Sequence, residues 1–248
     1  MTEDRRPLLA AERIRKRFGA LVVLDGVDFA VAPDEAVGVV GPNGAGKTTL
    51  LSILSGAQPP TSGAVAYQSR DVTLLDSAAR CRLGIVRTHQ IPRPFSGMTV
   101  FENIFVAAAN GGGFDRAEAY DRVVDAIGLC GMGGVANRRA ETLGLLDRKR
   151  LELARALGAN PKLLLLDEIG GGLTDAEAGE LVAAIRELRR RQIAIVWIEH
   201  IVHILLQVVE RLVCMDAGRV IANGEPRAVM ADPAVVEAYL GGDVHGAA

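Results

Sequence analysis

The stretch that decides the fold is Gly41-Pro42-Asn43-Gly44-Ala45-Gly46-Lys47-Thr48-Thr49. It fits the pattern G-x-x-x-x-G-K-[ST], which is typical of a loop that binds phosphate groups. The apolar run Ala36–Val40 before it predicts a buried strand, and Leu50–Leu54 after it predicts the first turns of a helix. Because this motif requires a strand before the loop and a helix after it, the surroundings strengthen the assignment.

The residue types in this loop suit phosphate binding. Gly41, Gly44 and Gly46 permit backbone conformations that a Cβ atom would block, so the N–H groups of the loop can converge on phosphate oxygens. The positive end of the following helix dipole adds to this field. Lys47 supplies a charge for the β- and γ-phosphates, and the Thr48 hydroxyl is a ligand for Mg²⁺. The register of Gly-Lys-Thr argues against a glycine-rich turn that binds nothing.

Length and composition predict one large α/β domain with a substantial core. The chain has 248 residues, of which 49% are hydrophobic. The net charge is −2, from 28 basic and 30 acidic residues, so there is no electrostatic case for nucleic acid as the main partner. Cys81, Cys130 and Cys214 are odd in number and far apart, which indicates reduced, buried thiols in a cytoplasmic protein.

No stretch of the sequence predicts a membrane span or a signal peptide. The segment Met1–Arg6 is not followed by an apolar core. The most apolar stretch, Ile193–Val209, is too short for a transmembrane helix and contains Glu199, His200 and His203. If the protein works at a membrane, another subunit must therefore cross it.

The N-terminal part of the chain predicts strands. Leu8–Phe18 and Val22–Val31 are expected to be two strands joined by a turn at Gly19. Shorter strands are expected at Ala64–Tyr67 and Ile85–Thr88. Two interpretations of Phe18 remain open: packing in the core, or stacking of a surface aromatic on a nucleobase.

The middle of the chain predicts helices. Thr99 and Glu102 have the spacing of a capping box, and Asp115 and Glu118 have N-cap and N3 spacing for the next helix. The segment from about Phe95 to Asn137 is therefore expected to be mostly helical and inserted between two strand-bearing halves. Further helices are expected at Leu151–Leu157, after the capping box of Thr174 and Glu177, and at Ala234–Leu240.

Two buried strands are predicted to end in polar residues. Leu163–Leu166 leads into Asp167 and Glu168, and Ile193–Ile198 leads into Glu199-His200. In open α/β sheets, ligands bind at the carboxyl ends of parallel strands, so these residues are expected to face a nucleotide. A lone histidine is usually structural, but this position favours a functional His200. Leu212–Met215 and Val220–Ala222 predict a final hairpin.

These motifs, in this order, resemble the ATP-binding subunit of ABC transporters, over about Leu8–Gly241. The resemblance implies an α/β fold: a P-loop NTPase core with an N-terminal antiparallel β part and a helical insert at about 95–157. It identifies Gly41–Thr49 as Walker A, and Leu163–Asp167 as Walker B, with Asp167 acting on Mg²⁺ through its shell.

The same resemblance implies roles for four more residues. Glu168 corresponds to the carboxylate that polarises the attacking water, and His200 to the switch histidine on the γ-phosphate. Gln90 corresponds to the glutamine that senses Mg²⁺ and the γ-phosphate and that links to the membrane subunit. Phe18 corresponds to the aromatic residue that stacks on adenine.

A finer resemblance is to the importers of branched-chain amino acids and their amide and urea relatives. Of the two ATPase types in such importers, the stretch Arg-Thr-x-Gln favours the LivG type. The stretches that carry the resemblance are Arg17-Phe18-Gly19, Arg87-Thr88-His89-Gln90, Met98-Thr99-Val100-Phe101-Glu102-Asn103, Ile198-Glu199-His200 and Glu237-Ala238-Tyr239-Leu240-Gly241.

The chain departs from the family pattern at three places. The signature Leu-Ser-Gly-Gly-Gln aligns with Leu143-Gly144-Leu145-Leu146-Asp147, which lacks the serine hydroxyl and has two leucines where close backbone approach to the γ-phosphate is expected. The D-loop aspartate position holds Thr174, with Asp175 next to it. His89 stands where this subgroup often has an aromatic residue.

The resemblance implies an ATPase that hydrolyses Mg-ATP by in-line attack of water and drives transport. It implies a head-to-tail dimer, as a homodimer or with a second ATPase subunit, in which each ATP meets the partner's signature. The implied partners are transmembrane permease subunits and, indirectly, a substrate-binding protein, and the implied place is cytoplasmic, on the inner face of the cell membrane.

Two other classes of function remain open. One is a soluble ABC ATPase that acts on ribosomes or DNA, for which a second ATPase domain or a long coiled coil would be expected. The other is a regulatory half that hydrolyses ATP poorly, which the altered signature supports and the presence of Glu168 and His200 opposes.

Overall fold

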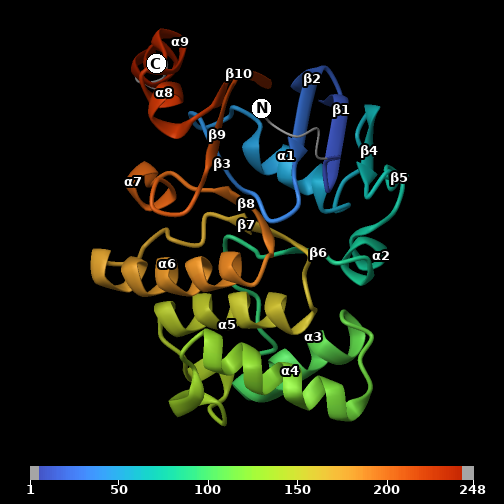
Figure 1. Cartoon of the computed structure of the whole chain (residues 1–248), viewed down its shortest axis with the longest axis vertical. Coiled ribbons are helices and arrows are strands. Elements are labelled where there is room, and N and C mark those ends of the chain that lie inside the picture. The colour runs from blue at the N-terminus through green and yellow to red at the C-terminus, as the bar shows by residue number, and fades with distance from the viewer. Residues whose placement is uncertain (1–5, 242–248) are drawn as a thin grey trace.

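The computed structural model describes residues 6–241, whose strands form two sheets (Figure 1). An antiparallel sheet has the strand order β2-β1-β4-β5, and a mixed sheet has the order β10-β9-β3-β8-β7-β6. The strands are β1 (Leu9–Phe18), β2 (Leu21–Val31), β3 (Ala36–Val40), β4 (Ser62–Tyr67), β5 (Arg70–Asp71), β6 (Ile85–Arg87), β7 (Leu163–Asp167), β8 (Ala194–Ile198), β9 (Arg211–Asp216) and β10 (Arg219–Gly224).

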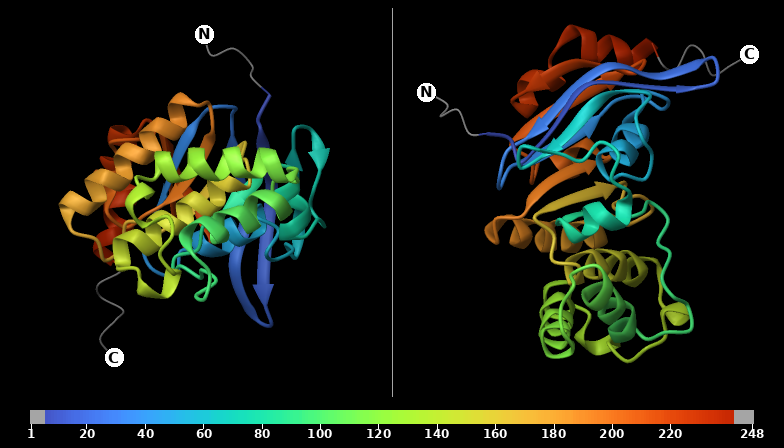
Figure 2. Two further views of the ribbon diagram at one scale, coloured as in Figure 1. Left: turned by 90° about the horizontal axis from the view of Figure 1, so that it is seen from below. Right: turned by 90° about the vertical axis from the view of Figure 1, so that its right-hand side faces the viewer.

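The helices lie mainly on the far side of the mixed sheet from the antiparallel sheet (Figures 1 and 2). Helix α1 lies between the two sheets, and α8 and α9 lie beside β9 and β10, at the same end of the molecule as the antiparallel sheet (Figure 1). The helices are α1 (Lys47–Leu54), α2 (Ser77–Arg82), α3 (Val100–Asn110), α4 (Arg116–Leu129), α5 (Leu145–Gly158), α6 (Asp175–Arg190), α7 (Val202–Leu205), α8 (Pro226–Met230) and α9 (Pro233–Gly241), with 3₁₀ turns at Gly133–Val135 and Ala140–Thr142.

The antiparallel part is the long hairpin β1–β2 with β4 alongside it. Phe18 pairs with Leu21 at the end of the hairpin, and Gly19 in the turn has φ +57°, a conformation that favours glycine. The predicted pair of strands with a turn at Gly19 is therefore confirmed.

The strands of the mixed sheet run parallel except for the edge strand β10, which pairs antiparallel with β9. Its inner strands β3, β7 and β8 are buried on both faces, as the leucine run predicts for β7, whereas the edge strand β10 is partly exposed. Leu163 and Leu165 of β7 join the core that faces α1 and the antiparallel sheet, whereas Leu164 and Leu166 join the core under the remaining helices. Because β3, β7 and β8 are neighbours and run parallel, their carboxyl ends lie at one edge of the sheet.

Helices α3, α4 and α5 form the end of the molecule farthest from the antiparallel sheet (Figure 2, right). Reciprocal capping boxes start α3 at Thr99 with Glu102 and α4 at Asp115 with Glu118, as predicted. Helix α5 begins at Leu145, six residues before the helical stretch that the sequence indicates. The two leucines of the altered signature are therefore its first residues.

Several features differ from the expectations or escaped them. The helices α2, α7 and α8 are only four to six residues long, too short to give a recognisable hydrophobic period.

All three cysteines are free, but Cys81 is only partly buried, because it borders a groove on the surface. Burial raises the pKa of Cys130 to about 12 and that of Cys214 to about 11.

Among the helices of residues 6–241, none combines the length and the apolar character that a membrane crossing requires. The first five residues, for which no signal peptide is expected, lie outside the described part of the chain.

Candidate nucleotide site

The loop between β3 and α1 has the backbone that its glycines predict. Gly41, Gly44 and Gly46 have φ values of +141°, +82° and +96°, in the region that side chains disfavour. A Cβ atom on Gly46 would lie 2.9 Å from the carbonyl oxygen of Val23, so β2 closes against the loop. Gly46 is the N-cap of α1 and has no side-chain cap, which leaves the first N–H groups of that helix available to an anion.

Lys47 lies in the loop with its ammonium group held by backbone oxygens. Its Nζ donates to the carbonyl oxygens of Gly41 at 2.7 Å and Pro42 at 2.9 Å. The residue is buried, and this burial lowers the pKa of Lys47, an effect that the nearby charge of Glu168 opposes. The loop thus holds a desolvated cation beside a carboxylate from another strand.

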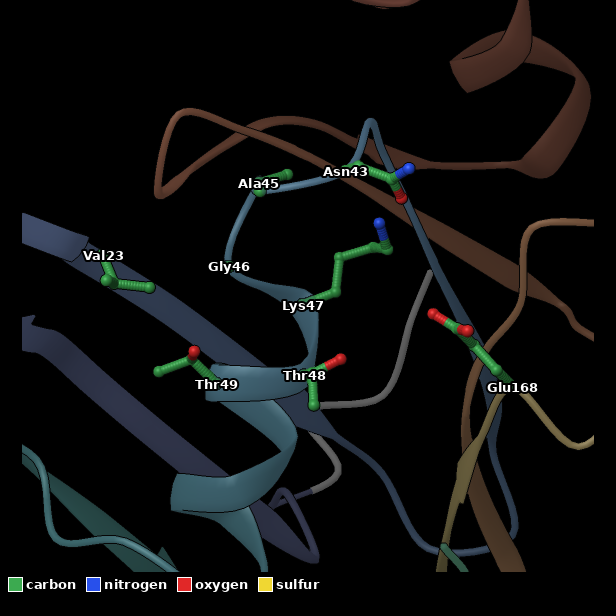
Figure 3. A pocket seen from close by; sticks show the side chains of 9 residues that line it. Val23, Asn43, Ala45, Gly46, Lys47, Thr48, Thr49 and Glu168 are labelled. Carbon is green, nitrogen blue, oxygen red and sulfur yellow. The ribbon is translucent and has the colours of Figure 1, made fainter. Parts of the chain in front are cut away.

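A cavity of about 190 Å³ lies over this loop and α1. Its lining includes Val23 from β2 and Glu168 from the end of β7. Figure 3 shows Lys47, Thr48 and Glu168 around one common space, with Glu168 reaching it from the side opposite the loop. The other lining residues belong to the loop and the start of α1: Asn43, Gly44, Ala45, Gly46 and Thr49.

Glu168 joins three distant segments of the chain. It follows β7 with φ +47°, a left-handed conformation that is costly for a residue with a side chain. Its Oε1 lies 2.7 Å from Nε2 of His200, and its Oε2 accepts a hydrogen bond from Nε2 of Gln90. The three candidate catalytic residues of the sequence therefore meet at the edge of the sheet.

Asp167 lies directly beneath this group and is almost fully buried. Its Oδ2 forms an ion pair at 2.6 Å with Nη2 of Arg87. Nη1 of the same arginine donates to the hydroxyl of Ser52 in α1 at 2.9 Å. The backbone N–H of Asp167 donates to the hydroxyl of Thr88 at 3.3 Å. Arg87 and Thr88 thus tie Asp167 to α1 and to β6.

The residues present fit a Mg²⁺ ion held partly by the nucleotide. The atom Oδ1 of Asp167 is buried without a hydrogen-bond partner, which is the state expected of an oxygen that serves a cation. Within residues 6–241, His, Cys, Asp and Glu side chains form no cluster of three or more that could hold a metal. Mg²⁺ in such sites typically uses one or two protein oxygens together with phosphates and water.

Two predicted parts of the site lie outside this cavity. Phe18, at the end of β1, is 47% exposed with Lys16 Nζ 5.0 Å from the centre of its ring, so it is not a core residue. Gly144 is the N-cap of α5 in extended conformation without a side-chain cap. Leu145 is 49% exposed, whereas Leu146 and Asp147 are partly buried.

Sequence reasoning missed several residues of the site. Arg87 and Thr88 entered only as part of a family motif. Glu199 was expected only to lie at the nucleotide edge, and nothing was expected of Lys149, although both side chains are buried. A charged residue directly after a buried strand, as at Glu199, is a sequence signal that could have indicated a residue of the site. For Lys149, on a helix rich in charged residues, the sequence offers no such signal.

The fold and the loop between β3 and α1 define a P-loop nucleotide-binding domain of α/β class. Residues 24–170 match the family model described as ABC transporter. Residues 219–245 match a second model, described as branched-chain amino acid ATP-binding cassette transporter.

Individual relatives agree over nearly the whole chain. The high-affinity branched-chain amino acid transport ATP-binding protein LivG of Escherichia coli (strain K12) is 36% identical, covering 95% of this chain and 98% of its own length. The corresponding protein BraF of Pseudomonas aeruginosa is 33% identical, with 95% and 98% covered. A crystal structure of an ATP-binding cassette of an ABC transporter in its ADP conformation has a TM-score of 0.86 and 31% identity, with 95% and 99% covered.

The chain therefore belongs to the ABC transporter family, as an ATP-binding subunit. It is an ATPase of the kind that couples hydrolysis to transport, and the predicted α/β P-loop fold is confirmed.

Proposed function

We propose that this chain powers a branched-chain amino acid importer, with Glu168, Gln90 and His200 acting on ATP held by Walker A. The observation that carries this proposal is the contact of both Gln90 and His200 with the carboxylate of Glu168, at the edge of the cavity above Lys47. A carboxylate so placed can orient or deprotonate a water molecule in line with the γ-phosphate.

The remaining residues stabilise charge. The loop N–H groups from Gly41–Thr49 and the ammonium of Lys47 face the phosphates, and His200 holds the γ-phosphate. Phe18, with its ring exposed beyond the loop, stacks on the adenine. Thr48, Asp167 and Gln90 are the residues that would hold Mg²⁺, directly or through water. When bound, Mg²⁺ neutralises charge on the β- and γ-phosphate oxygens.

Each ATP site is completed by a second ATPase subunit in a head-to-tail dimer. The segment that reaches the partner's nucleotide is the signature, Gly144-Leu145-Leu146-Asp147. Its exposed start at the N-terminus of α5 supports this role, because that helix end presents free N–H groups to an anion.

A groove of about 170 Å³ beside Gln90 is suited to dock the permease. It lies between β6, α3 and α5, and its lining includes Arg87, His89 and Arg155. The N–H of His89 donates to Glu152 in the groove, and the next residue, Gln90, bonds Glu168. Movement of an occupant is thereby coupled to the candidate catalytic carboxylate.

The relatives support the proposed substrate and location. Their names, together with the match at residues 219–245, support branched-chain amino acids as the substrate, and a substrate-binding protein would deliver them to the permease. The protein would then work in the cytoplasm, attached to the inner face of the membrane by the permease subunits.

Proteoliposomes with the permease subunits and the second ATPase test this proposal. We expect ATP-dependent uptake of leucine that Lys47→Ala abolishes. Ile91→Asp, at an apolar side chain 71% exposed just after Gln90, should reduce permease-stimulated ATPase activity. Leu74→Asp, 88% exposed between β5 and α2, is the matched control and should have no effect. Equal stimulation in both variants would reject the surface at Ile91, next to Gln90, as part of the docking site.

A further inference from the structure

Two oppositely charged side chains, not used in the proposal above, are buried next to the candidate catalytic residues. Lys149 of α5 is 4% exposed, and Glu199, directly after β8, is 1% exposed. Burial of a charge is unfavourable unless the group is paired or hydrogen-bonded. The bonding partners of these two side chains therefore indicate what holds them in place.

Both side chains bind the same peptide group. Nζ of Lys149 donates to the carbonyl oxygen of Ile169 at 2.9 Å, and the N–H of Gly170 donates to Oε2 of Glu199 at 2.8 Å. That carbonyl and that N–H belong to one planar peptide bond. A buried cation thus meets the negative end of the peptide dipole, and a buried anion meets its positive end.

The second oxygen of Glu199 extends this clamp to His200. The N–H of His200 donates to Oε1 of Glu199 at 3.0 Å, and Nε2 of the same histidine lies 2.7 Å from Glu168. Because Ile169 follows Glu168 in the chain, Glu199 holds the backbone on both sides of the Glu168–His200 contact.

The structure leaves no room for a side chain inside the clamp. A Cβ atom on Gly170 would lie 2.8 Å from Oε2 of Glu199. Burial lowers the pKa of Lys149, and the charges of Glu199 and Glu168 oppose that shift, which agrees with a cation kept close to both carboxylates.

Lys149 carries the connection to the signature. Helix α5 begins at Leu145, so Lys149 lies within its first two turns, directly behind the segment that faces the partner's nucleotide. A displacement of this helix end moves the Ile169–Gly170 peptide with it.

We propose that Lys149 and Glu199 are positioning residues, which clamp the Ile169–Gly170 peptide and so couple the signature end of α5 to Glu168 and His200 of the same subunit. This inference rests on the proposed function, because it requires Glu168 and His200 to act on ATP. It predicts that contact with the partner's nucleotide adjusts hydrolysis in this subunit's own site.

Single-turnover hydrolysis by the full chain tests the clamp. Both oxygens of Glu199 accept backbone N–H groups, so in Glu199→Gln the new NH₂ group must face one of these donors. We expect the resulting shift of Glu168 and His200 to lower the rate of hydrolysis about 10- to 100-fold. The Kd for ATP should stay at the wild-type value, because the Walker A loop is untouched. Glu35→Gln is the control for loss of a bonded carboxylate, since Glu35 accepts the N–H of Ala32 at 2.8 Å and pairs with Arg211 at 2.6 Å, but lies before β3, at the end of that strand away from the phosphate loop.

The double variant Lys149→Met/Glu199→Gln separates positioning from stability. Removal of both charges leaves no unpaired buried ion, so its Tm should exceed that of either single variant. Hydrolysis should nevertheless stay as slow as in Glu199→Gln. Recovery of the rate together with the Tm would overturn the proposal, because the charges would then serve folding alone.

The His200→Ala variant tests whether Glu199→Gln lowers the hydrolysis rate through His200. There, Glu199→Gln should lower the remaining rate by less than about threefold, since effects that act through one group are not additive. The same loss in both backgrounds would reject coupling through His200. If Glu168→Gln and His200→Ala themselves hydrolyse ATP at the wild-type rate, both the proposed function and the clamp fail. A wild-type rate in Glu199→Gln alone would remove only the clamp.

Discussion

At the scale of single residues, side chains that are far apart in the sequence meet in the folded structure. Glu168 meets Gln90 and His200 because β7, β6 and β8 end at one edge of the sheet. Its left-handed φ of +47° is a local strain, of the kind found at functional sites.

Lys47→Ala should weaken ATP binding roughly 10- to 100-fold, because charge-assisted hydrogen bonds to phosphate would be lost. The fold should survive, because the ammonium donates only to two carbonyl oxygens of its own loop. Isothermal titration calorimetry with Mg-ATP measures the affinity, and circular dichroism checks the fold. An unchanged Kd would contradict the assignment of the phosphate loop.

At the scale of elements, one buried arginine joins the helices α1 and α2 to the segment after β5. Arg80 of α2 is fully buried and donates to five backbone oxygens. Two of these, on Ile53 and Leu54, belong to the C-terminal end of α1, and two, on Val72 and Thr73, follow β5. Burial lowers the pKa of Arg80 to about 10, so the guanidinium still carries its charge at neutral pH.

Arg80→Met should reduce the free energy of unfolding by about 3–5 kcal/mol, because it leaves buried carbonyl groups without donors. Urea denaturation followed by circular dichroism measures this. Arg82→Met, on the exposed side of the same helix, is the control and should change stability by less than about 0.5 kcal/mol. A similar, small effect of both substitutions would refute the structural role of Arg80.

The elements also show what a sequence can predict. The capping boxes at Thr99, Asp115 and Thr174 and the leucine run of β7 are local patterns, and each appears where it was expected. Arg80 and Lys149 escaped prediction because burial of a long cation depends on carbonyl groups from distant segments. The short helices α2, α7 and α8 escaped because they form where the chain turns, without a period of their own.

At the scale of the whole molecule, the altered signature decides how two subunits cooperate. Its two leucines are the first residues of α5, and a Cβ atom on Gly172 would lie 3.3 Å from Leu145, so this side chain covers the loop after β7. Closure of a dimer around ATP at a site completed by this segment is expected to be weak. We therefore expect low ATPase activity from the subunit alone and higher activity with the second ATPase and the permeases.

Restoring the family pattern should raise the activity of the subunit alone. The triple variant Gly144→Ser/Leu145→Gly/Leu146→Gly regains one hydroxyl contact to a charged phosphate, which corresponds to a gain of about tenfold. Gly144 already has the extended N-cap conformation that serine prefers, so the helix should still start there. Robust turnover of the wild-type subunit alone, with no gain in the variant, would show that the leucine-bearing signature supports ATP hydrolysis as well as the family sequence does.

The proposed hydrolysis depends on Glu168, which activates the water that attacks an ATP held by Walker A. Glu168→Gln keeps the shape of the side chain and removes its charge and basicity. The most direct test compares the Kd for Mg-ATP with the single-turnover rate in this variant, beside the Glu35→Gln control. We expect an unchanged Kd and a rate about 10²- to 10⁴-fold below that of the wild type, the usual contribution of a general base. Wild-type turnover in Glu168→Gln would show that Glu168 is not this base.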